Sequence, residues 1–221
     1  MGTLYWQLND TWPGISWSST DYYGRWKALH YSLKELYGTM MITTTIKDRH
    51  VDVYVVSDSL YDDLARMELR VLDLKGNLRW SEVAAADIKA NACSQVLSRD
   101  LSRYILPFDT DNVVLNIRIY RDDRIIAESN RYFCLPKSLR LRRPALTVRE
   151  LPALDGYRRF EVKSSVLAKN AELSFNDDPS LFDRNYLDLL PGERYEFRIT
   201  DSAFPADASG KIKIHSLIDT Y

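Results

Sequence analysis

Alternation between apolar and polar residues is the sequence feature that most restricts the fold of this chain. From residue 40 onward, apolar side chains recur at every second position, as in Val51, Val53 and Val55, and again from Val113 to Ile119. A period of two is that of a strand with one buried face. Short strands separated by turns are typical of antiparallel sandwiches. We therefore expect a mainly β protein.

Turn sequences separate the predicted strands. Arg121-Asp122-Asp123-Arg124 reads as a charged hairpin turn, Asp155-Gly156 is a two-residue hairpin signal, and Lys75-Gly76-Asn77 reverses the chain. The strands are expected at 40–46, 50–57, 67–71, 78–83, 113–119, 125–134, 145–150, 157–164, 171–175, 194–201 and 211–217.

A proline-bracketed basic segment, Leu135 to Pro144, divides these strands into two groups. Isolated basic clusters on a nearly neutral protein are usually surface, so we interpret the segment as a last strand and linker rather than an anion site. The grouping predicts two β-sandwiches in tandem, over residues 38–136 and 137–221.

Charge and composition argue against several classes of function. The 30 basic and 31 acidic residues give a net charge of −1, so no overall field favours nucleic acid or membrane. No apolar run approaches the roughly 20 residues of a membrane span. His30, His50 and His215 are scattered, so we expect no metal and no cofactor. Cys93 and Cys134 allow one disulfide, but two buried thiols is the interpretation we favour.

The segment from residue 2 to residue 37 differs from the rest of the chain in its aromatic content. Thr3 to Leu8 predicts a short strand, and Pro13-Gly14 marks a loop after it. An amphipathic helix is predicted where apolar residues recur at helical spacing, at Trp26, Leu29, Leu33 and Leu36. Four of the five tryptophans lie in this segment: Trp6, Trp12, Trp17 and Trp26.

Two sequences in this segment, GTLYWQLNDTWP and WSSTDYYGRWKALHY, resemble the eighth strand and helix of the (β/α)8 barrel in glycoside hydrolase family 2, in its β-mannosidase branch. The sequences LSF at 173–175 and NYLDLLPGE at 185–193 more weakly resemble the terminal immunoglobulin-like domain of the same enzymes. The resemblance implies a remnant of the last β/α unit at 1–37, followed by two immunoglobulin-like β-sandwiches. It also implies that the chain is the C-terminal part of a longer enzyme.

The activity implied by the resemblance is that of an exo-acting retaining β-mannosidase, which removes terminal β-D-mannosyl residues. Retaining glycosidases need two carboxyl groups about 5 Å apart, and the family places both glutamates on earlier barrel strands. We therefore expect no catalytic residue in this chain and no activity from it alone. Two alternatives stay open: a fragment of another family 2 glycosidase, such as an exo-β-glucosaminidase, and a non-catalytic carbohydrate-binding β-sandwich protein.

Three residues are the expected substrate contacts: Trp6, Asn9 and Asp10. The resemblance implies that Trp6 lines the sugar pocket, where an indole face packs on the sugar and its N–H reaches a hydroxyl; the alternative is a core tryptophan. Asp10 is expected either to bind sugar hydroxyls or to hold the loop by accepting backbone N–H bonds, and we favour the second. Trp26 is expected in the core.

A first strand without barrel neighbours would leave unpaired backbone groups and exposed aromatic residues. We expect residues 1–37 to pack on the first sandwich, to pair with another copy, or to be disordered. The expected partners are thus a β-mannoside carbohydrate and, through this segment, a second copy of the chain. No signal peptide precedes the predicted strand at Thr3. Because an absent signal says nothing about location if the true N-terminus is missing, the cellular compartment of the protein stays open, and exported, periplasmic and lysosome-like locations are all compatible.

Overall fold

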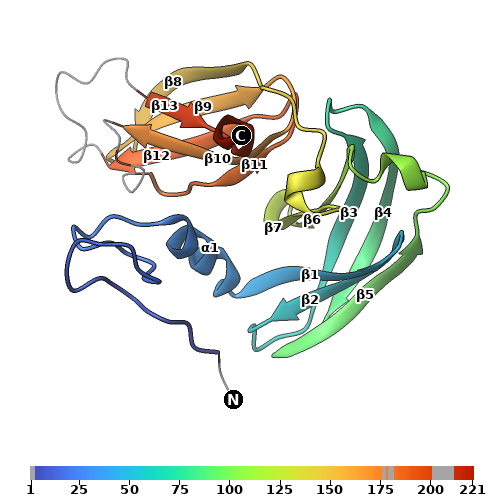
Figure 1. Cartoon of the computed structure of the whole chain (residues 1–221). Helices are drawn as coiled ribbons and strands as arrows, with labels where there is room; N and C mark the ends of the chain where they lie inside the picture. The colour runs from blue at the N-terminus through green and yellow to red at the C-terminus, as the bar shows by residue number, and fades with distance from the viewer. Residues whose placement is uncertain (1–2, 176–177, 179–181, 201–211) are drawn as a thin grey trace. The chain divides into compact units, whose positions relative to one another are not determined.

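A computed structural model describes residues 3–175, 178, 182–200 and 212–221 of the chain (Figure 1). The described residues form two compact units. One unit is Leu36–Arg142, and the other combines Met1–Glu35 with Arg143–Tyr221. The predicted mainly β fold with immunoglobulin-like sandwiches is confirmed.

The unit Leu36–Arg142 is a sandwich of two antiparallel sheets. One sheet has the strand order β1-β2-β5, and the other has the order β4-β3-β6-β7. Its strands are β1 (Met40–Lys47), β2 (His50–Ser57), β3 (Asp63–Asp73), β4 (Leu78–Ile88), β5 (Ala92–Asp100), β6 (Val113–Arg121) and β7 (Arg124–Arg131), with short 3₁₀ helices at Pro107–Asp109 and Pro136–Ser138.

The core of this sandwich consists of the alternating apolar residues that predicted the strands. Val53, Val55 and Met67 are wholly buried, and so are Ile117 and Ile119 on β6. Successive side chains of a strand point to opposite faces of the sheet, so one apolar residue in every two is enough to fill the space between two sheets.

Two-residue turns close the hairpins that the sequence predicted. Asp122 and Asp123 both have positive φ, 47° and 60°, and join β6 to β7. Asp155 and Gly156, with φ of 52° and 77°, join β8 to β9 in the same way. Positive φ at both central residues matches the right-handed twist of the flanking strands, which is why Asp-Gly signals a hairpin.

The second unit contains the other sandwich, again with antiparallel sheets. Its sheets have the orders β12-β9-β8 and β11-β10-β13 around a core that includes Phe160, Phe175 and Phe197. Its strands are β8 (Leu146–Leu154), β9 (Tyr157–Ser164), β10 (Ala168–Phe175), β11 (Leu187–Leu189), β12 (Tyr195–Thr200) and β13 (Ile212–His215), with a 3₁₀ helix at Leu217–Thr220.

Helix α1 (Ala28–Leu36) joins this second sandwich through Tyr31, the buried residue of the helix. The Tyr31 hydroxyl donates to the Phe182 carbonyl at 2.9 Å, and Lys34 Nζ donates to the Asp183 carbonyl at 2.6 Å. Packing of residues 1–37 on the second sandwich was not among the three arrangements that we expected for this segment. The prediction that the apolar face of the helix is buried is also wrong, because Leu29 and Leu36 are 40% and 55% exposed.

Some sequence predictions need correction. Residues 3–8 form no strand, and Trp26 lies before α1, half-buried rather than in the core. Residues 3–8 lack a neighbouring strand to pair with their backbone groups, and the barrel that would supply such a strand stays a prediction.

Cys93 is exposed and Cys134 is half-buried. Both are free, so the disulfide is not formed, and Cys93 is not a buried thiol. Predicted strand positions 201 and 211 lie outside the described residues.

Candidate functional site

The loop between residues 3 and 27 is held by backbone hydrogen bonds on both sides of a central segment, Ser18 to Thr20. On one side the Ser19 and Thr20 amides donate to the carbonyls of Gln7 and Leu8, both at 2.9 Å. On the other side the Lys27 amide donates to the Ser19 carbonyl at 2.9 Å. The stretch that precedes the central segment is therefore fixed in place without being part of a regular sheet.

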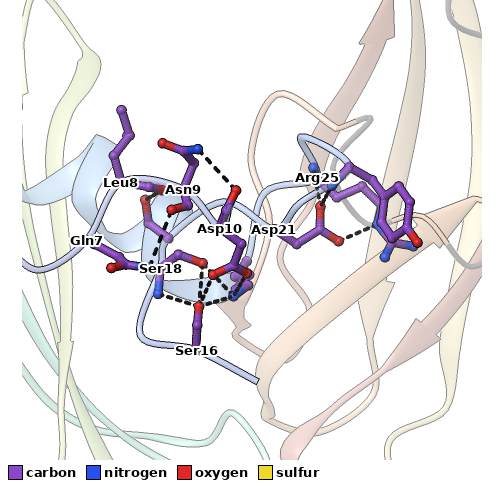
Figure 2. Close-up of polar contacts among 11 residues, drawn as sticks. Gln7, Leu8, Asn9, Asp10, Ser16, Ser18, Asp21 and Arg25 are labelled. Carbon is purple, nitrogen blue, oxygen red and sulfur yellow. Dashed lines mark hydrogen bonds and ion pairs between the residues drawn. The ribbon is translucent and has the colours of Figure 1, made fainter. Parts of the chain in front are cut away.

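A compact turn returns the chain from the central segment to Lys27. The Asp21 carboxylate accepts the backbone N–H groups of Tyr23 and Arg25 at 2.9 Å, and the Arg25 guanidinium lies 2.6 Å from its second oxygen (Figure 2). Gly24 has φ of 81°, in the region that favours glycine. The turn is thus specified locally by an aspartate and a glycine.

Asp10 is buried, with 7% of its surface exposed, and its carboxylate is fully engaged. Ser16 donates its hydroxyl to Oδ1, and Lys27 Nζ lies 3.1 Å from Oδ2 (Figure 2). The Ser16 hydrogen bond chiefly, with support from Lys27, holds the pKa of Asp10 below its ordinary value despite the burial. Lys27 Nζ also donates to Ser18 Oγ at 2.7 Å. Asp10 therefore joins Ser16 and Lys27, two distant parts of the loop, through its buried carboxylate.

Trp6 and Asn9 lie differently from Asp10. Trp6 is 76% exposed, and the peptide bond between Trp6 and Gln7 is cis. Asn9 is exposed, and Figure 2 shows its side chain on the opposite side from the Asp10 carboxylate, with its amide donating to the Asp10 carbonyl at 3.2 Å. The three predicted residues are thus close in the chain, but only two of them face solvent.

The aromatic residues of the loop are also largely exposed. Trp12 and Trp17 are 72% and 78% exposed, and Tyr23 is 67% exposed. An exposed aromatic side chain can pack on the apolar face of a sugar and exclude water from it. These exposed rings are available for contact with a ligand, whereas the Asp10 carboxylate is already engaged by Ser16 and Lys27.

Sequence reasoning missed the polar residues that hold this loop. Ser18 and Ser19 lie well before α1 and are buried, at 3% and 0% exposure. The signal was present as a run of small hydroxyl residues beside an apolar segment. The hydrogen-bond partners of these two serines could not be read from the sequence, because the Leu8 carbonyl and the Lys27 amine reach them only after the loop folds back.

Features that would indicate other classes of site are not found in the described part of the chain. The described residues contain no group of three or more histidine, cysteine, aspartate or glutamate side chains placed to hold a metal ion. Among those same residues, no helix has the length and apolar content needed to cross a membrane.

Comparison with known proteins gives a consistent result over nearly the whole chain. Residues 49–138 match the mannosidase Ig/CBM-like domain family, and residues 141–220 match the Ig-fold domain family. Beta-mannosidase A of Aspergillus terreus is 30% identical, over 90% of this chain and 23% of its own length. Beta-mannosidase A of Aspergillus clavatus is 28% identical, over 99% of this chain and 25% of its own.

Solved structures agree on the fold. The β-D-mannosidase of Dictyoglomus thermophilum matches 96% of this chain with a TM-score of 0.82 at 19% identity, using 26% of its own chain. The exo-chitosanase of Amycolatopsis orientalis matches 96% of the chain with a TM-score of 0.62 at 14% identity, using 29% of its own. The chain spans about a quarter of the length of the curated relatives it matches. The chain therefore contains a mannosidase Ig/CBM-like domain and an Ig-fold domain, and over this region it is similar in sequence to Beta-mannosidase A and in fold to a β-mannosidase of glycoside hydrolase family 2.

Proposed function

We propose that this chain is part of an exo-acting retaining β-mannosidase that hydrolyses terminal β-D-mannosyl residues. Relatives named Beta-mannosidase A align with 90% or more of the chain and support this substrate class. The structural observation that carries the proposal is Trp6, a 76% exposed indole on a backbone fixed by hydrogen bonds from Ser19 and Thr20. An exposed aromatic ring on a fixed backbone is the arrangement that binds a sugar face with little ordering cost.

Each of the three site residues has a different role in this proposal. Trp6 packs on the sugar ring, and the exposed amide of Asn9 offers a donor and an acceptor to a sugar hydroxyl. The Asp10 carboxylate is engaged by Ser16 and Lys27, so it holds the loop instead of binding the sugar directly. Direct binding would require breaking an ion pair whose carboxylate is buried, which is costly.

The catalytic step is assigned to a part of the protein outside this chain. Retention requires an acid/base carboxyl group and a nucleophilic carboxylate about 5 Å apart across the scissile bond. We propose that both are supplied by the remaining three quarters of the longer protein, as the length of the relatives implies. This chain then supplies one wall of the sugar pocket and two accessory sandwiches, and it is inactive alone.

The test compares this 221-residue chain with the protein encoded by the complete reading frame that contains it. Both are assayed on aryl β-mannoside, aryl β-glucosaminide and aryl β-glucoside. We expect β-mannoside turnover from the longer protein and a rate at the level of the blank from the chain alone. Turnover by the chain alone, or a longer protein that prefers β-glucosaminide, contradicts the proposal.

The stereochemistry is tested on the same longer protein by following the anomeric protons of released mannose by NMR. A retaining enzyme releases β-mannose first, and the α-anomer then appears by mutarotation. Initial release of α-mannose would show inversion and refute the double-displacement mechanism. Heat on titrating the isolated chain with mannose oligomers would instead favour the carbohydrate-binding module.

The exposed apolar side chains of the N-terminal loop lead to a proposal for the isolated chain. Leu4, Trp6 and Ile15 are 99%, 76% and 109% exposed, and large exposed apolar areas mark interaction surfaces. We propose that two copies of the isolated chain associate through this loop. Sedimentation velocity should show a concentration-dependent shift that is lost in a Trp6→Ser, Ile15→Ser double variant, and a concentration-independent monomer would refute the proposal.

A further inference from the structure

The buried hydroxyl of Ser19 connects the N-terminal loop to helix α1. Ser19 has no exposed surface, and its Oγ lies 3.1 Å from the Leu8 carbonyl oxygen, 3.0 Å from His30 Nδ1 and 3.3 Å from the Tyr5 hydroxyl. Leu8 lies between Trp6 and Asn9, the two residues proposed to face the sugar. A single side chain therefore meets the sugar-facing segment on one side and the helix on the other.

The number of protons available at Ser19 fixes the direction of these hydrogen bonds. A serine hydroxyl donates one hydrogen bond and accepts two, whereas a carbonyl oxygen only accepts. The Ser19 proton is therefore directed to the Leu8 carbonyl, and the other two partners must donate to Ser19 Oγ. It follows that His30 carries its proton on Nδ1 and that the Tyr5 hydroxyl also donates.

His30 is itself held from two directions. Its ring packs against that of Trp26, with 4.4 Å between the ring centroids and an angle of 49° between the ring planes. It precedes Tyr31, whose hydroxyl anchors α1 to the Phe182 carbonyl of the terminal sandwich at 2.9 Å. The backbone of His30 is thus tied to the sandwich through Tyr31, and its ring is placed by Trp26 and Ser19.

We propose that Ser19 and His30 are positioning residues for the sugar-facing segment, with His30 acting as an Nδ1–H donor to Ser19. The proposal rests on the proposed function, because Trp6 and Asn9 are the residues whose placement it explains. The terminal sandwich is then more than an accessory domain, since it fixes the binding segment through Tyr31, His30 and Ser19.

The first test is the tautomer of His30 in the 221-residue chain, read from long-range ¹⁵N–¹H correlations of the ring at a pH where it is neutral. We expect Nδ1 to be protonated and Nε2 to be bare. The opposite tautomer, or a rapidly exchanging mixture, overturns the proposal. The measurement involves no sugar, so it supports or refutes the arrangement independently of any hydrolytic activity.

A matched pair of variants tests whether the Nδ1–H donor itself matters. His30→Asn places an amide N–H close to the position of Nδ1, whereas His30→Gln places it close to that of Nε2. The readout is hydrogen exchange at the Thr20 amide, which donates to the Leu8 carbonyl. We expect exchange to rise about tenfold in Ser19→Ala and His30→Gln and to stay near the wild-type rate in His30→Asn.

The control is Ser32→Ala, which removes an exposed hydroxyl bonded within α1 to the Ala28 carbonyl. It should leave Thr20 exchange unchanged. Equal exchange rates in His30→Asn and His30→Gln overturn the proposed donor role. In the longer protein, Ser19→Ala should lower kcat/KM for an aryl β-mannoside about tenfold, and an unchanged value overturns the positioning role even if exchange responds.

Discussion

The hydroxyl of Tyr31 donates a hydrogen bond of 2.9 Å to the backbone carbonyl of Phe182, joining two residues 151 positions apart in the sequence. Tyr31 is 3% exposed, and burial raises the pKa of its hydroxyl well above the usual range. Its ring also lies near that of Tyr186, with 5.7 Å between the centroids. This relationship makes the N-terminal segment and the terminal sandwich parts of one compact unit.

Tyr31→Phe should lower the free energy of unfolding of this unit by about 1–2 kcal/mol, because the Phe182 carbonyl loses a buried donor while the packing of the ring is kept. Urea denaturation followed by tryptophan fluorescence measures the change. Tyr22→Phe, at a residue that is 50% exposed, is the control and should change stability by less than about 0.5 kcal/mol. Equal effects of the two substitutions would contradict the anchoring role of Tyr31.

Asn185 should be intolerant of substitution for a related reason. Its side-chain oxygen accepts the Leu173 amide and its side-chain nitrogen donates to the Leu173 carbonyl, both at 2.7 Å in a buried setting. Asn185→Asp keeps the acceptor and loses the donor, and we expect a loss of about 2–3 kcal/mol in unfolding free energy. A thermal or urea unfolding curve that coincides with the wild type would show that the two hydrogen bonds contribute little.

The Asp10 carboxyl should titrate below its ordinary value of 3.8. Because its folded pKa is lowered, the carboxylate stabilises the fold fully above 3.8, and this contribution is lost as the pH falls through the lower folded pKa. NMR titration of the Asp10 carboxyl carbon measures the value directly. Ser16→Ala should move the pKa upward, since the Ser16 hydroxyl is the principal cause of the shift. An unchanged pKa in that variant would contradict the assignment.

Glu196 offers a second pH test, within the terminal sandwich. Arg159 binds its carboxylate through two nitrogens at 2.9 and 2.6 Å, and this pairing, first among the causes, lowers the pKa of Glu196 to about 2. The pair should stabilise the fold fully above the ordinary value of 4.5 and lose its effect as the pH falls through about 2. Arg159→Met should cost about 1 kcal/mol at neutral pH and less in acid. A pH-independent cost would refute this account.

The strands were the most predictable part of the fold, because alternation and turn chemistry are local. The ranges of β2 and β9 were predicted to the residue, and the Asp155-Gly156 turn was identified correctly. Strand β5 was missed because Ala92–Asp100 lacks regular alternation, and β11 because it has only three residues.

The N-terminal segment was less predictable because its structure depends on distant partners. Helical spacing predicted that Leu29 and Leu36 are buried. In the structure the buried residue of the helix is instead Tyr31, whose hydroxyl bonds to the Phe182 carbonyl. Trp6, Asn9 and Asp10 could be proposed from the resemblance, but not the ion pair that engages Asp10. The Lys27 amine that forms it is 17 positions away, and its placement follows from the turn at Asp21 to Arg25.

The most direct test of the account is the effect of Trp6→Ala on hydrolysis of an aryl β-mannoside by the protein of the complete reading frame. If Trp6 packs on the sugar, its removal should cost about 2 kcal/mol of binding, or a roughly 30-fold fall in kcat/KM. Because Trp6 is 76% exposed in this chain, the variant of the isolated chain should unfold at the wild-type denaturant concentration when both are measured at concentrations where they are monomeric. A kcat/KM within twofold of the wild type would contradict the central claim that this segment forms a wall of the sugar pocket.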